Sequence, residues 1–111
     1  MREGIAIIVD DEVDICRLLS SFLRRRYQHV FYALSLNEGL ALANEHRPEL
    51  LILDNNLPDG IGIQMIPAFR MTCKKILVIS AMNNIQEEAI RAGADAFIAK
   101  PVSFKDIEAY L

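Results

Sequence analysis

The sequence lacks the features that mark several classes of protein. Its 111 residues include two cysteines, Cys16 and Cys73, and no Cys-x-x-Cys motif. This excludes a disulfide framework or a thiolate metal centre, so both thiols are expected to be reduced and to pack as small apolar groups. Positive charge is not in excess, because the net charge is -3. We therefore expect no direct binding of nucleic acid by this domain.

Long hydrophobic runs are also missing. No apolar run approaches the length of about 18 residues that a membrane-spanning helix needs. The first run, residues 5–9, is followed at once by acidic residues, which is not the pattern of a signal peptide. The sequence therefore predicts no membrane association and a cytoplasmic location.

The chain is nevertheless strongly apolar, with 52% hydrophobic residues. A chain of this length buries one core, so residues 1–111 are predicted to form one domain. Apolar runs alternate with amphipathic segments along the whole sequence. The runs predict strands at 5–9, 30–33, 49–53, 75–80 and 95–99. The other segments predict helices at 13–26, 36–46, 60–71 and 85–93, and a last helix from Ser103 to the end.

Several helix ends carry recognisable signals. Ser35 with Glu38 forms a capping-box pattern, and Ser103 with Asp106 opens the last helix. Gly93 is expected to end the fourth helix, and the arginines at 24–26 to lie at the end of the first. The central strands are apolar without a gap, which indicates a sheet covered on both faces. The predicted fold is α/β: a single doubly wound five-stranded parallel sheet with helices on both faces.

Polar side chains stand where the predicted strands end. Asp10 and Asp11 follow the first strand, Asp54 follows the third, Ser80 ends the fourth, and Lys100 follows the fifth. In a doubly wound fold, ligands bind outside the carboxyl ends of the strands. The fold would therefore bring these residues together in one pocket.

The charges in this pocket predict its chemistry. Three carboxylates repel one another, and Lys100 compensates one of them. The remaining two negative charges match one divalent cation that prefers oxygen ligands, for which Mg²⁺ is the natural candidate. Asp10, Asp11 and Asp54 would hold it, and the carbonyl of Asn56 would add a ligand. A carboxylate, an ammonium, a hydroxyl and Mg²⁺ are the groups needed to receive a phosphoryl group.

At these positions the sequence resembles the receiver domain of two-component response regulators, over essentially its whole length. The matching motifs are the acidic pair Asp10-Asp11, the phosphoacceptor Asp54 within "LDNNLPDG", the Ser80-Ala81 pair, and the switch aromatic Phe97 within "GADAFIAKP", which also contains Lys100. Each motif is weak alone, but together, in order and at matching strand ends, they are specific.

The resemblance implies a flavodoxin-like receiver fold and a role in a phosphorelay. A histidine kinase or a histidine phosphotransfer protein would phosphorylate Asp54. The domain would catalyse its own phosphorylation and dephosphorylation rather than act as a conventional enzyme. Ser80 and Phe97 would be switch residues. The output would come from an effector domain beyond Leu111 or from a partner protein, and activation would allow a homodimer.

Two features depart from the usual pattern of the family. The stretch from Ser80 to Gly93 is short, which affects the usual switching surface, and so is the stretch between Asp54 and the fourth strand. Met82 and Asn56 are predicted to tune the lifetime of the phosphoryl group. Met82 bonds water poorly and should shield the phosphoryl group, which predicts slow hydrolysis, whereas the Asn56 amide would hold a water.

Simpler interpretations exist for single residues. The acid pair could cap a helix, Asp54 could form a turn, Ser80 could be structural, Lys100 could lie on the surface and Phe97 in the core. Two other functions also stay open. A haloacid dehalogenase-type phosphatase needs a second aspartate where this chain has Asn56. A degenerate interaction module would lack an acid or the lysine, and none is missing. His29, His46, the arginines at 24–26 and the Gly60-x-Gly62 pair are assigned no catalytic or nucleotide-binding role.

Overall fold

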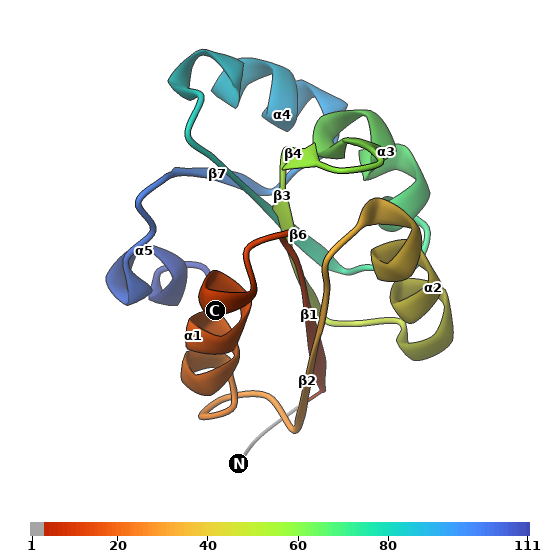
Figure 1. The fold of residues 1–111 in the computed structure, drawn as a ribbon, viewed down its shortest axis with the longest axis vertical. Coiled ribbons are helices and arrows are strands. Elements are labelled where there is room, and N and C mark those ends of the chain that lie inside the picture. Colours follow the sequence, from red (N-terminus) through yellow and green to blue (C-terminus); the bar gives the residue numbers. More distant parts are fainter. Residues whose placement is uncertain (1–3) are drawn as a thin grey trace.

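The computed structural model describes residues 4–111, so the part of the predictions that concerns residues 1–3 lies outside the described residues. Its centre is a parallel five-stranded sheet with the strand order β2-β1-β3-β6-β7 (Figure 1). The strands are β1 (Ile5–Val9), β2 (His29–Ala33), β3 (Leu50–Asp54), β6 (Lys75–Ser80) and β7 (Ala96–Ala99). Each lies within one residue of its predicted bounds.

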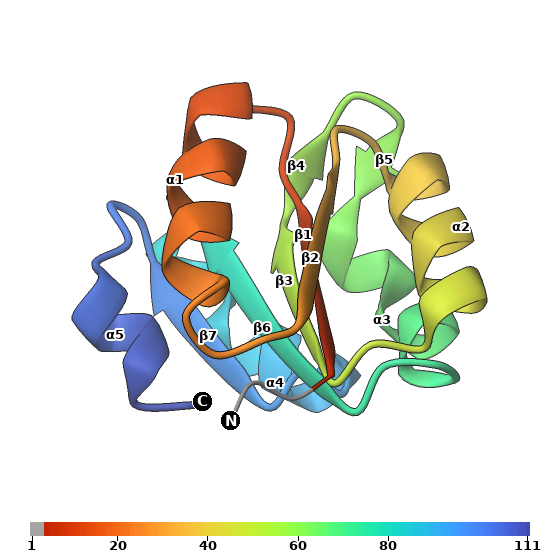
Figure 2. The ribbon, with the colours of Figure 1, turned by 90° about the horizontal axis from the view of Figure 1, so that it is seen from below.

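Helices cover both faces of the sheet, which confirms the doubly wound prediction. One face carries α1 (Val13–Leu23) and α5 (Phe104–Glu108), and the opposite face carries α2 (Leu36–His46), α3 (Gly62–Arg70) and α4 (Gln86–Ala92). Figure 2 shows α1 and α5 on one side of the sheet and α2 and α3 on the other. Within residues 4–111, every helix falls short of the length and apolar character that crossing a membrane requires.

The core lies on both sides of the central strands, as their uninterrupted apolar sequences predicted. Along β3, Leu50 and Ile52 pack toward α1, whereas Leu51 and Leu53 pack toward α2 and α3. All five residues of β3 are buried. Cys16 and Cys73 are also buried, and neither forms a disulfide, as expected.

The predicted capping residues are present at most helix ends. The Ser35 hydroxyl accepts a hydrogen bond from the amide of Glu38 at 3.2 Å. Ser103 and Asp106 form a reciprocal capping box, and Gly93 ends α4 with a φ of 117°. A short 3₁₀ helix, η1 (Asn83–Ile85), precedes α4.

The first and the last helix end earlier than predicted. The first helix stops at Leu23, and the arginines at 24–26 form the following turn, whose amides bond three or four residues back. This turn brings Tyr27 into the core, where it is 9% exposed. The last helix ends at Glu108 instead of continuing to Leu111, because the chain leaves the helix in a turn at Ala109 and Tyr110.

A small antiparallel ribbon that sequence reasoning did not predict follows β3. It consists of β4 (Asn56–Leu57) and β5 (Gly60–Ile61), joined by the Pro58-Asp59 turn. The ribbon delays the third helix, which begins at Gly62 and not at residue 60. Its position directly after Asp54 makes it part of the site described next.

Candidate functional site

The predicted site residues meet at the carboxyl ends of the strands, at the upper edge of the sheet in Figure 2. The strands β1, β3, β6 and β7 are successive neighbours and run parallel, so their ends bring together Asp10, Asp54, Ser80 and Lys100. Asp10 and Ser80 are 0% exposed and Asp54 is 4% exposed. These three polar groups lie inside the molecule, so they are neither ordinary turn residues nor solvated surface residues.

The Lys100 ammonium lies among three carboxylates. Its Nζ is 3.3 Å from Asp10 Oδ2, 3.5 Å from Asp54 Oδ1 and 3.3 Å from Glu12 Oε1. Burial of Lys100 favours the neutral amine, but the charges of Asp54 and Asp10 outweigh it and raise the pKa of Lys100 above its ordinary value. Lys100 is therefore a fixed positive charge in the pocket.

The two buried acids carry more negative charge than Lys100 compensates. Burial and the nearby Asp10 charge raise the pKa of Asp54 to about 6, against the opposing effects of Lys100 and the Asn55 amide. Burial also raises the pKa of Asp10. Such shifts mean that the ionised forms are under-solvated, so a further cation at this place would stabilise them.

The acidic residues fit a divalent cation that prefers oxygen ligands. One carboxylate oxygen each from Asp10, Asp11 and Glu12 lies within 4.8 Å of the others. Asp10 Oδ1 accepts a hydrogen bond from the Glu12 amide, but Asp10 Oδ2 is buried without a hydrogen-bond partner. Lys100 Nζ forms an ion pair with this oxygen at 3.3 Å. A buried carboxylate oxygen that accepts no other hydrogen bond is a suitable ligand atom for Mg²⁺.

Sequence reasoning missed two residues of the site. Glu12 contacts Lys100, and the third acid of the "DDE" run was the signal for it. Asn55 is 5% exposed, and its side-chain oxygen accepts a hydrogen bond from the Ile63 amide at 3.1 Å. The Asn55 amide in turn donates to Asp54 Oδ1 at 2.9 Å. Asn55 therefore links the Asp54 carboxylate to the first turn of α3.

Gly62 lies where the chain passes close to the backbone of β3. A Cβ atom at this position would lie 2.3 Å from the backbone oxygen of Asp54. The Gly62 amide also donates to the Asn55 carbonyl at 2.7 Å. Glycine is needed here because backbone approaches backbone.

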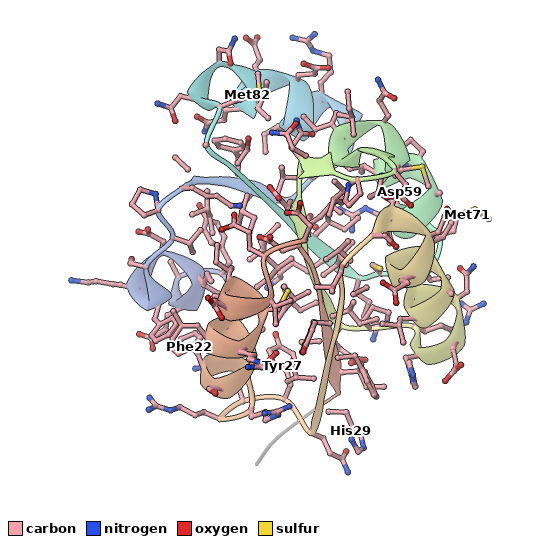
Figure 3. The ribbon with its side chains drawn as sticks, viewed as in Figure 1. Phe22, Tyr27, His29, Asp59, Met71 and Met82 are labelled. Atoms are coloured by element: carbon pink, nitrogen blue, oxygen red, sulfur yellow. The ribbon has the colours of Figure 1, made fainter. Side chains whose placement is uncertain are left out.

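The proposed switch and lifetime residues lie around the pocket. The Ser80 hydroxyl accepts a hydrogen bond from the Met82 amide at 3.0 Å. Met82, labelled in Figure 3, is 44% exposed, and Asn56 is exposed in β4. Phe97 on β7 is half-buried and packs against the core beneath α2, α3 and α4. The fold brings Ser80 to the acids, while Phe97 lies one strand away.

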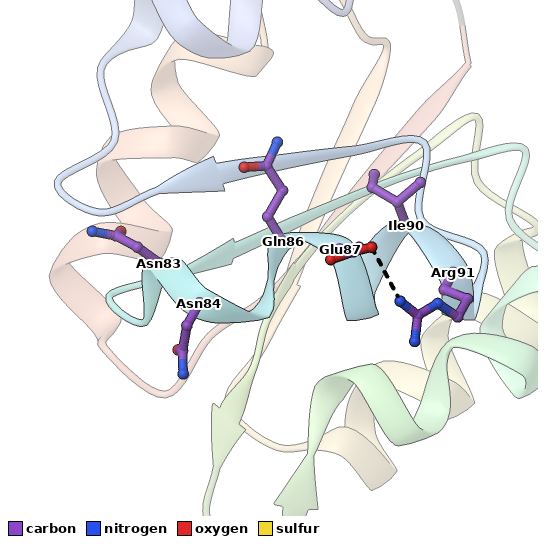
Figure 4. Close-up of a pocket in the computed structure, with 6 residues that line it drawn as sticks. All are labelled: Asn83, Asn84, Gln86, Glu87, Ile90 and Arg91. Atoms are coloured by element: carbon purple, nitrogen blue, oxygen red, sulfur yellow. Dashed lines mark ion pairs between the residues drawn. The ribbon is translucent and has the colours of Figure 1, made fainter.

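A shallow hollow on η1 and α4 is separate from this pocket (Figure 4). It is lined by Asn83, Asn84, Gln86, Glu87, Ile90 and Arg91. Its charged groups, Glu87 and Arg91, form an exposed ion pair at 3.4 Å. The short stretch between Ser80 and Gly93 is accommodated here by a helix of only seven residues.

The fold and site together define a phosphoacceptor signalling module rather than a conventional enzyme. A doubly wound domain presents buried acids and a lysine at its strand ends. The chain belongs to the response regulator receiver domain family, whose model matches residues 6–111. It is therefore a receiver domain of two-component response regulators and acts in phosphoaspartate signalling.

Curated relatives support this assignment. The chain is 37% identical over 108 residues to the KDP operon transcriptional regulatory protein KdpE of Escherichia coli strain K12, which covers 95% of this chain and 48% of KdpE. It is 33% identical over 109 residues to the acid tolerance regulatory protein ActR of Rhizobium meliloti, covering 95% of this chain and 56% of ActR. The chain thus spans about half the length of the curated relatives it matches.

Solved structures show the same fold. A Burkholderia pseudomallei response regulator with a phosphorylated aspartic acid, a calcium ion and citrate is 27% identical, with a TM-score of 0.88, over 96% of this chain and 65% of that one. A CheX–CheY complex with BeF₃ and Mg²⁺ from Borrelia burgdorferi is 21% identical, with a TM-score of 0.84, over 95% of this chain and 84% of that one. The second likeness supports the fold alone.

Proposed function

We propose that Asp54 is the phosphoacceptor of this receiver domain. A carboxylate oxygen of Asp54 attacks the phosphorus of a phosphohistidine on a histidine kinase or a histidine phosphotransfer protein. The new O–P bond replaces the N–P bond, and the released imidazole takes up a proton. The observation that carries the proposal is the place of Asp54, buried at the end of β3 beside the ammonium of Lys100.

The other pocket residues take roles that follow from their charge. Lys100 neutralises negative charge on the phosphoryl oxygens, and the Ser80 hydroxyl donates a hydrogen bond to one of them. Asp10, Asp11, Asp54 and the Asn56 carbonyl would hold Mg²⁺. When bound, Mg²⁺ would neutralise charge that develops on the transferring group. The buried Asp10 Oδ2, whose charge partner among the described residues is Lys100 alone, supports this donor set.

Phosphorylation would then shift the domain between two conformations through Ser80 and Phe97. KdpE is a transcriptional regulatory protein of about twice this length, so we propose that the output acts through an effector domain or a partner protein. A homodimer on activation belongs to the same proposal. A cytoplasmic location is consistent with two buried cysteines that form no disulfide.

Incubation with acetyl phosphate and Mg²⁺, followed by intact mass measurement, tests the acceptor. The wild type should gain the mass of one phosphoryl group, and chelation of Mg²⁺ should prevent it. Asp54→Asn should gain none. Asp14→Asn removes an exposed acid of α1 outside the pocket and should label like the wild type.

Three outcomes would overturn the proposal. Full labelling of Asp54→Asn would show that another residue accepts the phosphoryl group. An unlabelled wild type would indicate a degenerate interaction module, and rapid turnover of phosphate esters would indicate a phosphatase.

A further inference from the structure

Asp59 joins the loop after the acceptor to a helix distant in sequence. It lies in the turn between β4 and β5, beside the first turn of α2 (Figure 3). Asp59 Oδ1 accepts a hydrogen bond from the Leu36 amide at 2.8 Å, and Oδ2 accepts one from the Asn37 amide at 2.9 Å. These two hydrogen bonds lower the pKa of Asp59 below its ordinary value. The carboxylate therefore satisfies two amides that the helix itself cannot satisfy.

Packing strengthens this attachment. A Cβ atom on Gly60 would lie 3.1 Å from Leu36 Cδ1, and Gly60 has a φ of 154°. Leu57, on the other strand of the ribbon, packs against the core. The tip of the ribbon is thus held on α2 by both hydrogen bonds and close contact.

The base of the ribbon is held separately. Asn55 accepts hydrogen bonds from the amides of Gly62 and Ile63 at the start of α3. Between the two anchors lies Asn56, which pairs with Ile61 in the ribbon. The backbone that should offer a carbonyl to the cation is therefore fixed at one end by α3 and at the other by α2.

We propose that Asp59 is a positioning residue for phosphoryl transfer. By holding the ribbon tip on the N-terminus of α2, it keeps the Asn56 backbone in the position that completes the donor set beside Asp54. This inference rests on the proposed function of the same pocket. Loss of Asp59 would remove the hydrogen bonds that hold the ribbon tip on α2, leaving Asn55 and the contacts of Gly60 and Leu57, and would weaken the cation site without removing a ligand.

Ser35 provides a control for the capping role alone. Its hydroxyl accepts a hydrogen bond from the Glu38 amide, so it also caps α2. Ser35 is adjacent to the helix, whereas Asp59 reaches it from 23 residues away. Ser35→Ala would loosen the helix end but leave the ribbon tip attached, whereas Asp59→Ala would loosen both.

The test is the dissociation constant of Mg²⁺, measured by calorimetry on the folded wild type, Asp59→Ala, Asp59→Asn and Ser35→Ala. Asp59→Ala should raise the dissociation constant by about 10-fold, as loss of a residue that orients metal ligands typically does. Asp59→Asn keeps one acceptor oxygen, so its dissociation constant should lie between those of Asp59→Ala and the wild type. Ser35→Ala should leave the constant within about 2-fold of the wild type. Saturating Mg²⁺ should restore acetyl phosphate labelling of Asp59→Ala.

An unchanged dissociation constant in Asp59→Ala would overturn the proposal. An equal rise in Ser35→Ala would also overturn it, because capping of α2 would then explain the effect. Backbone amide shifts of residues 55–61 provide a second readout: they should change in the Asp59 variants and not in Ser35→Ala. If the wild type binds Mg²⁺ but takes no phosphoryl group, the proposed function fails, while the comparison of dissociation constants still decides the role of Asp59.

Discussion

The Lys100 ammonium donates a hydrogen bond to the Glu12 carboxylate at 3.3 Å, whereas its Nζ is 3.5 Å from Asp54 Oδ1. Glu12 therefore competes with Asp54 for the same positive charge. A phosphoryl group on Asp54 adds negative charge within reach of Lys100 and should draw the ammonium away from Glu12. The position of Lys100 is thus expected to report the state of the pocket.

Lys100→Ala should separate cation binding from phosphoryl transfer. Removing one positive charge from beside Asp10 and Asp54 should tighten Mg²⁺ binding by about 3-fold or more, by simple Coulomb interaction. Labelling by acetyl phosphate should slow, because the phosphoryl oxygens lose a charge partner. Lys105→Ala removes an exposed lysine outside the pocket and serves as the control. Loss of Mg²⁺ binding in Lys100→Ala would contradict this account.

Asp54→Asn should stabilise the domain at neutral pH in the absence of divalent cations. The pKa of Asp54 is raised in the folded state from an ordinary 3.8 to about 6, so the unfolded state releases this proton first. Stability is therefore lost as the pH rises from about 4 through about 6. The loss amounts to about 3 kcal/mol at most.

Urea denaturation in a chelating buffer measures this effect. Asp54→Asn should exceed the wild type by about 1–3 kcal/mol at pH 7.5 and by about a third of that at pH 4.5. Mg²⁺ should reduce the difference at pH 7.5, because it binds the folded wild type more tightly. An equal gain at both pH values would show that the variant acts by packing and not by titration.

Ser80→Ala should still accept the phosphoryl group but change conformation poorly. The Ser80 hydroxyl now accepts from the Met82 amide, and it should instead donate to the phosphoryl oxygen. A hydrogen bond to a charged group contributes about 1.5–3 kcal/mol, or about 10- to 100-fold in the ratio of the two conformations. Amide shifts near Phe97 on addition of beryllofluoride report the change. Shifts equal to those of the wild type would show that Ser80 does not couple the two sites.

Met82→Gln and Met82→Glu should shorten the lifetime of the phosphorylated form. Each would give an attacking water a hydrogen-bond partner at the mouth of the pocket, where the thioether offers none of comparable strength. The expected change is about 10-fold, equivalent to about 1.4 kcal/mol of barrier. The decay of phosphorylated protein is followed after the phosphodonor is removed, with Mg²⁺ present. Identical decay in all three proteins would show that this side chain does not control access of water.

The sheet and the order of its strands and helices could be predicted because each element has its own pattern of apolar residues in the sequence. The uninterrupted apolar run of β3 requires cover on both faces, and the structure supplies it. The fold class then placed Asp10, Asp54 and Lys100 together without any signal linking them in the sequence. The first helix was predicted too long, because arginines continue its favourable composition past Leu23 although the chain turns there.

The remainder depended on long-range contacts that a single sequence does not show. The strands of the ribbon have only two residues each, too few for an alternating pattern. Asp59 reads as an ordinary turn residue until α2 is placed beside it. Glu12 was overlooked for a similar reason, since its partner Lys100 is 88 residues away.

The five residues of α5 are too few to form a stable helix by themselves. The helix depends on the stacked rings of Phe104 and Phe22, 4.4 Å apart, and on Ile107, which is 0% exposed. Local opening of α5 should therefore require far less free energy than opening of β3, and its amides should exchange with solvent deuterium long before those of the central strands. The contact of α5 with the C-terminal end of α1 is thus broken from time to time, while the sheet that holds the acids in place stays intact.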